Sequence, residues 1–173
     1  METWFANRGI GRPIAESLAA TMAWFHRWLA GVAPSGRPVF LVGFSGGAAF
    51  AGGLALDQPE RFSGVAVLYG TVPFDAGVPV TANRLAALPV FVAQGDRDRV
   101  IPAELLERTW AYLHTESSAP VTSRRDPGGH RTSADTAAEL NSRVLGLPAM
   151  AGSGSGELDP VGLGGITAHL AEP

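Results

Sequence analysis

Residues 39–47 read Val-Phe-Leu-Val-Gly-Phe-Ser-Gly-Gly. The first four form a continuous apolar run, which is typical of a strand buried on both faces of a parallel sheet. Residues 43–47 then fit the pattern G-x-S-x-G, and the small, apolar residues 48–56 predict a helix directly after it. A strand, a tight turn and a helix around one serine predict a nucleophile elbow, in which Ser45 is presented for attack on a substrate.

Each glycine of this turn has a predicted role. Gly43 and Gly47 lie on either side of Ser45, where a larger side chain would collide with the sharply turned backbone. The N–H group of Gly46, at the start of the helix, is placed to donate a hydrogen bond to an oxyanion, and the helix N-terminus adds partial positive charge. An ordinary glycine-rich turn would contain the same residues, so the elbow is a hypothesis that depends on its strand and helix.

A dinucleotide-binding turn is the second interpretation of these glycines. It requires G-x-G-x-x-G after a strand and an acidic residue at the end of the next strand. Ser45 occupies the place of the second glycine, and Tyr69-Gly70 stands where the acidic residue is required. The sequence therefore disfavours nucleotide binding.

Outside this stretch, apolar runs alternate with amphipathic segments, which predicts a layered α/β fold with a mostly parallel sheet of about four strands. We expect further strands at residues 64–69, 89–93 and 119–123, and further helices at residues 13–32, 103–114 and 133–145. Residues 70–87 form a long loop. Its Val72, Phe74 and Val78 either wall a substrate pocket or only close the core.

The composition fits one domain with a core of its own. The chain has 173 residues, of which 46% are hydrophobic and 17% charged. We expect the domain to span residues 1–145, and the residues 146–173, rich in Gly, Ser and Pro, to form a flexible tail. The net charge of −3 gives no basic surface for nucleic acid.

The absence of two residue types excludes several kinds of chemistry. The chain has no Cys, which excludes a thiolate nucleophile, disulfides and Cys–zinc sites. It has no Lys, which excludes a Walker lysine and Schiff-base chemistry.

No apolar run reaches the roughly 18 residues of a membrane span, and residues 1–11 lack the apolar segment of a signal peptide. We therefore expect a cytoplasmic protein.

A carboxylate suited to a hydrolytic triad follows the predicted strand at residues 89–93. Residues 94–102 read Gln-Gly-Asp-Arg-Asp-Arg-Val-Ile-Pro, and polar residues after a strand are typical of α/β sites. Asp96 and Asp98 are both able to orient a histidine and to stabilise its charged form. A solvated turn with Asp–Arg pairs would have the same sequence.

His130 is the candidate general base. It ends the run Asp-Pro-Gly-Gly-His at residues 126–130, in a loop after the last predicted strand, whereas the other three histidines lie on predicted helices or in the tail. The order serine, aspartate, histidine along the chain is the order found in α/β-hydrolases.

With these pieces in place, the chain resembles the phospholipase/carboxylesterase family of α/β-hydrolases. The resemblance covers residues 4–145 and rests on Trp4-Phe5, GFSGG at 43–47, GDRDRVIP at 95–102 and PGGH at 127–130. The family pattern G-x-x-D-x-V-[IV]-P aligns its acid with Asp98 rather than Asp96. Arg99 and Arg131 depart from the residues common in the family, but neither is a triad position.

The resemblance implies a serine hydrolase that cleaves small-molecule carboxylic esters through an acyl-enzyme intermediate. Ser45 would be the nucleophile, His130 the general base, and Asp98 the acid that orients it. The Gly46 N–H would stabilise the oxyanion. No metal or organic cofactor is implied.

Family members also have strands before the elbow strand, and an HG-type loop that donates the second oxyanion hydrogen bond, whereas this chain starts after both. We therefore expect the strand at residues 39–42 to lie at an unpaired edge of an incomplete α/β-hydrolase sheet, through which copies of the chain could associate. An incomplete site also leaves an alternative function open, a catalytically silent fragment that acts as a binding or interaction module.

Overall fold

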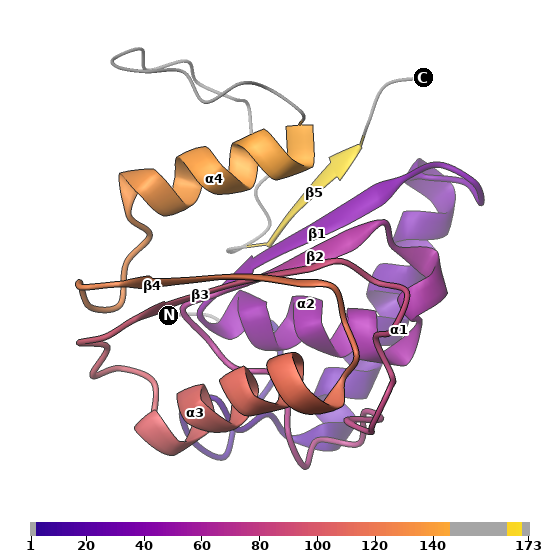
Figure 1. Ribbon diagram of the computed structural model, residues 1–173. Coiled ribbons are helices and arrows are strands. Elements are labelled where there is room, and N and C mark those ends of the chain that lie inside the picture. The colour runs from indigo at the N-terminus through magenta and orange to yellow at the C-terminus, as the bar shows by residue number, and fades with distance from the viewer. Residues whose placement is uncertain (1–2, 146–165, 171–173) are drawn as a thin grey trace.

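The sheet of the computed structural model, which describes residues 3–145 and 166–170, has five strands in the order β4-β3-β2-β1-β5 (Figure 1). Its first four members pair in parallel: β1 (Val39–Phe44), β2 (Gly64–Leu68), β3 (Val90–Gly95) and β4 (Val121–Asp126). The α/β class and the mostly parallel sheet predicted from the sequence are confirmed.

Helices cover both faces of this sheet (Figure 1). On one face lie α1 (Ala15–Val32), α2 (Gly46–Asp57) and α3 (Ala103–Ala111), and on the other lies α4 (Ala134–Leu145). A short 3₁₀ turn, η1 (Pro59–Arg61), follows α2, and a π-helical turn, η2 (Tyr112–Glu116), extends α3. Among the described residues, none of the helices combines the length and the hydrophobicity that a membrane span requires.

The core is divided between the two faces of the sheet. The larger cluster joins α1, α2 and α3 to the sheet, and α1 contributes its buried stripe of Leu18, Met22, Phe25 and Leu29. The smaller cluster lies under α4 and includes Tyr69. The strands β2 and β3 are buried along their whole length, which agrees with their apolar sequences; the buried Gln94 near the end of β3 is the exception.

The strand β4 continues to Asp126, three residues beyond the predicted end. Its last residues are Arg-Arg-Asp, so the backbone pairing with β3 continues past the point where the apolar residues end. The register pairs Gly95 of β3 with Asp126, and this pairing fixes where the loop that carries His130 begins.

A fifth strand, β5 (Ile166–Leu170), pairs antiparallel with β1, with Gly43 opposite Ile166 and Val39 opposite Leu170. The prediction that β1 lies at an unpaired edge is therefore wrong. The five-residue sequence Ile-Thr-Ala-His-Leu is too short, and its surroundings too rich in glycine, to stand out as a strand. These residues belong to the tail predicted to be flexible, while residues 146–165 and 171–173 lie outside the described residues.

Deleting residues 166–173 is expected to convert the protein into larger species on size-exclusion chromatography. Without β5, the N–H and C=O groups on one side of β1 lose their partners and form an edge for pairing with other chains. Deleting only residues 171–173 is the matched control and should leave the elution volume unchanged. An unchanged elution volume for the larger deletion would show that β5 does not protect the edge.

Candidate active site

Ser45 lies in the turn between β1 and α2, as the sequence predicted. Its backbone has φ 56° and ψ −118°, in a region that residues other than glycine rarely adopt. The Ser45 N–H donates to the carbonyl oxygen of Leu68 at 2.9 Å, and its own carbonyl accepts from the N–H of Ala48 at 3.0 Å. The strained turn is therefore held by β2 on one side and by α2 on the other.

The glycines around Ser45 differ in how much space surrounds them. A Cβ added at Gly43 would lie 2.0 Å from the carbonyl oxygen of Gly47, so only glycine fits there. A Cβ at Gly70, a position that the sequence analysis did not single out, would lie 2.5 Å from the carbonyl oxygen of Ser45. Gly46 has open space within 4 Å, and as the first residue of α2 its N–H has no partner within the helix.

Replacing Gly43 with alanine should lower the free energy of unfolding by about 3 kcal/mol, because the new methyl group meets backbone atoms that cannot move aside. Gly46→Ala, three residues further along the chain, should change this free energy by less than about 1 kcal/mol, because Gly46 has open space around it. Urea denaturation of both variants tests the difference. Equal stabilities would contradict the steric account of this turn.

The structure brings Ser45, Asp98 and His130 together from three separate segments. Nε2 of His130 lies 2.9 Å from Oγ of Ser45, and Nδ1 lies 2.8 Å from Oδ2 of Asp98. The other oxygen of Asp98 accepts the N–H groups of Val100 at 2.8 Å and Ile101 at 3.1 Å, which fixes the plane of the carboxylate. One continuous chain of hydrogen bonds therefore links carboxylate, imidazole and hydroxyl.

The two aspartates left open by the sequence occupy different surroundings. The Asp98 side chain is 0% exposed where it meets His130, whereas the Asp96 side chain is 52% exposed and lies 3.8 Å from the guanidinium of Arg125. Only Asp98 contacts the histidine. Asp96 has the environment of a solvated ion pair at the surface.

The loop at residues 70–87 contributes mainly to the core. Val72 is 1% exposed and Phe74 is 7% exposed, both within the large cluster, and Val78 packs against that cluster while partly buried. This favours the interpretation in which these side chains close the core.

The family model that matches the sequence covers residues 12–142 and describes phospholipases and carboxylesterases. The chain belongs to this family. The phospholipase/carboxylesterase family consists of α/β-hydrolases, and the resemblance noted in the sequence is therefore confirmed. No curated protein matches the chain significantly.

Solved structures of carboxylesterases share the fold. The enzyme from Mesorhizobium loti is 23% identical with a TM-score of 0.68, and the match covers 83% of this chain and 68% of that one. For the carboxylesterase of Bacillus cereus, the identity is 21% and the TM-score 0.69, with 80% of this chain and 66% of that chain covered. A phospholipase/carboxylesterase from Dyadobacter fermentans is 18% identical with a TM-score of 0.64, over 83% and 71% of the two chains.

A buried polar cluster around Asp126, which was not predicted from the sequence, lies beside the candidate active site of this phospholipase/carboxylesterase family member. Asp126 is buried, at 3% exposed. Its carboxylate accepts hydrogen bonds from Arg124 Nε at 3.0 Å, Ser133 Oγ at 3.0 Å, Thr136 Oγ at 2.7 Å and the Tyr69 hydroxyl. Two donors meet each oxygen, which uses the full acceptor capacity of an ionised carboxylate. Ser133 also caps α4, since its Oγ accepts the Thr136 N–H at 3.0 Å.

Burial raises the pKa of Asp126, but the hydrogen bonds from Tyr69, Thr136, Arg124 and Ser133 together outweigh this effect and lower the pKa to about 2. Because this value lies below the unfolded value of 3.8, the ionised carboxylate stabilises the fold above about pH 4. That stabilisation, about 2 kcal/mol, should disappear as the pH falls from about 4 through 2.

Urea unfolding of Asp126→Asn and of the wild type, between pH 6 and pH 2, measures this contribution. The variant should be less stable at pH 6, and the difference should shrink by about 2 kcal/mol toward pH 2. Asp75→Asn, at a carboxylate that is 71% exposed, is the control and should match the wild type throughout. A difference for Asp126→Asn that does not depend on pH would contradict the assignment of an ionised carboxylate.

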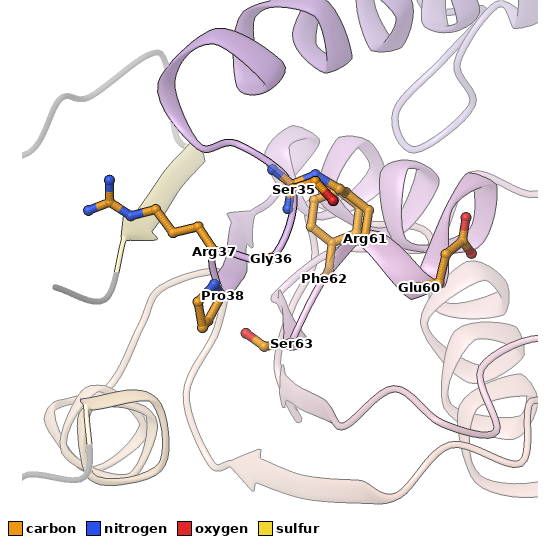
Figure 2. A pocket seen from close by; sticks show the side chains of 8 residues that line it. All are labelled: Ser35, Gly36, Arg37, Pro38, Glu60, Arg61, Phe62 and Ser63. Carbon is orange, nitrogen blue, oxygen red and sulfur yellow. The ribbon is translucent and has the colours of Figure 1, made fainter. Parts of the chain in front are cut away.

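A hollow of about 270 Å³ lies at the end of the sheet where β1 and β2 begin (Figure 2). It is lined by residues 35–38, which precede β1, and by residues 60–63, which precede β2. Ser45 follows the other end of β1, so this hollow is remote from the candidate active site.

Proposed function

We propose that the protein is a serine hydrolase that cleaves carboxylic esters of small molecules. The observation that carries the proposal is the hydrogen-bonded series from Asp98 through His130 to Ser45. Membership of the phospholipase/carboxylesterase family supports the class of substrate. In this proposal each of the three side chains has one role in acyl transfer.

In the first half of the reaction, Oγ of Ser45 attacks the ester carbonyl carbon while Nε2 of His130 accepts the hydroxyl proton. The carbonyl oxygen becomes an oxyanion, which the N–H of Gly46 stabilises. His130 then returns the proton to the leaving alkoxide, the C–O bond of the ester breaks, and an acyl group remains on Ser45.

In the second half, a water molecule gives a proton to Nε2 and attacks the acyl carbon. Collapse of the second tetrahedral intermediate releases the carboxylic acid, and Ser45 regains its proton from His130. Throughout, Asp98 holds Nδ1 so that Nε2 faces the serine, and its negative charge stabilises the imidazolium that forms twice per turnover. The two backbone donors on Asp98 keep this carboxylate in place.

Hydrolysis of p-nitrophenyl acetate and butyrate by the full chain tests the proposal. Turnover should disappear after treatment with an equimolar fluorophosphonate, in proportion to the fraction of protein modified. A silent binding module, the alternative raised by the sequence, would neither hydrolyse the esters nor react with the fluorophosphonate. That result would overturn the proposed function.

A further inference from the structure

His130 lies in a short loop whose two ends are tied to one carboxylate. Asp126, the last residue of β4, is four residues before it, and Ser133, which caps α4, is three residues after it. Ser133 donates to Oδ1 of Asp126 at 3.0 Å, and Thr136, in the first turn of α4, donates to Oδ2 at 2.7 Å. Residues 127–132 are therefore closed into a loop, with the histidine near its centre.

Tyr69 connects this loop to the nucleophile turn. Its side chain is fully buried, and its hydroxyl donates to Asp126 and accepts the N–H of Ser133 at 3.3 Å. Its ring centroid lies 5.9 Å from that of Phe44, the residue before the proposed nucleophile, and the Phe44 ring lies 5.1 Å from the imidazole of His130. Tyr69 has φ 48°, an unusual backbone conformation for a bulky residue, so it is held in place against strain.

The same loop also rests on the end of β3. The N–H of Asp96 donates to the carbonyl of Asp126 at 2.8 Å, and the N–H of Arg97 donates to the carbonyl of Gly128 at 2.9 Å. A Cβ at Gly95 would lie 2.4 Å from the carbonyl oxygen of Gly129, so the two backbones are in direct contact. These contacts hold the loop against the end of β3, whereas the hydrogen bonds to Asp126 join the two ends of the loop to each other.

We propose that Tyr69 and Asp126 are positioning residues, which hold the imidazole of His130 at hydrogen-bond distance from both Ser45 and Asp98. The inference rests on the proposed function for its effect on rate. A loop with two glycines before the histidine samples many conformations unless both of its ends are fixed. A displacement of about 1 Å at a catalytic group costs on the order of 10²-fold in rate.

Tyr69→Phe is the sharpest test, because it removes one hydroxyl, keeps the ring against Phe44, and leaves Asp126 with three donors. The control is Tyr112→Phe, which removes the hydroxyl of the other buried tyrosine, bonded to the Thr81 carbonyl at 3.0 Å. The measured quantity is the rate of Ser45 phosphonylation by a fluorophosphonate, followed by intact-protein mass spectrometry. Tyr69→Phe should slow it at least tenfold, and Tyr112→Phe less than twofold.

The same substitution in a His130→Ala background separates positioning from a general loss of stability. If Tyr69 acts through the imidazole, Tyr69→Phe should have less than a twofold effect once the imidazole is gone. An equal effect in both backgrounds, or no effect in either, overturns the proposal.

A second readout does not depend on activity. The imidazole N–H proton of His130 that is shared with Asp98 should give a protected downfield proton resonance in the wild type and in Tyr112→Phe, and a broadened or absent one in Tyr69→Phe. An unchanged resonance in Tyr69→Phe overturns the proposal. If the wild type shows this resonance but is never phosphonylated, the proposed function fails. The resonance in Tyr69→Phe then still shows whether Tyr69 positions His130.

Discussion

Ser45→Ala is expected to remove ester hydrolysis, with kcat falling by about 10⁶-fold for p-nitrophenyl acetate. The variant lacks the only oxygen that stands 2.9 Å from Nε2 of His130 among the described residues, so no acyl-enzyme can form. Steady-state turnover of the purified variant, measured beside the wild type, gives the ratio directly.

Ser118→Ala is the matched control for this experiment. Ser118 is an exposed serine with φ 58°, close to the 56° of Ser45, but it bonds Asn83 and lies outside the hydrogen-bonded series around His130. This control should keep wild-type turnover. Activity of Ser45→Ala within tenfold of the wild type would mean that another group performs the attack.

Asp98→Asn is expected to lower kcat by about 10⁴-fold while the KM for the ester changes little. The amide cannot stabilise the imidazolium, and its NH₂ group favours the tautomer of His130 in which Nε2 carries the proton and cannot accept one from Ser45. Stopped-flow or steady-state release of p-nitrophenol measures the loss.

Asp96→Asn makes the same chemical change two residues away. Its carboxylate is half exposed and faces Arg125 rather than the histidine, so kcat should stay within about threefold of the wild type. A larger loss for Asp96→Asn than for Asp98→Asn would mean that the wrong carboxylate has been assigned.

The nucleophile turn could be predicted from the sequence because its constraints are local. A buried strand, the glycines of the turn and a helix of small residues all lie within residues 39–57. The structure adds that Gly43 has no room for a side chain. The approach of Asp98 and His130 to Ser45 depends on strand order instead. It could be anticipated because the carboxyl ends of parallel neighbouring strands share one edge of the sheet.

Two features escaped sequence reasoning for different physical reasons. The strand β5 depends on the free edge of β1 far away in the chain, and its five residues carry little local signal. The Asp126 cluster joins residues from the ends of β2 and β4 and the start of α4, and each of them alone looks like an ordinary turn or capping residue. Its clue in the sequence was an acid placed directly before the loop of the candidate histidine.

The site of covalent modification tests whether Ser45 is the nucleophile of an ester hydrolase. The wild-type chain is incubated with a fluorophosphonate, digested and analysed by tandem mass spectrometry. We expect one phosphonyl group per chain, on Ser45. The absence of any adduct on a folded protein, or an adduct on a different residue, would contradict it.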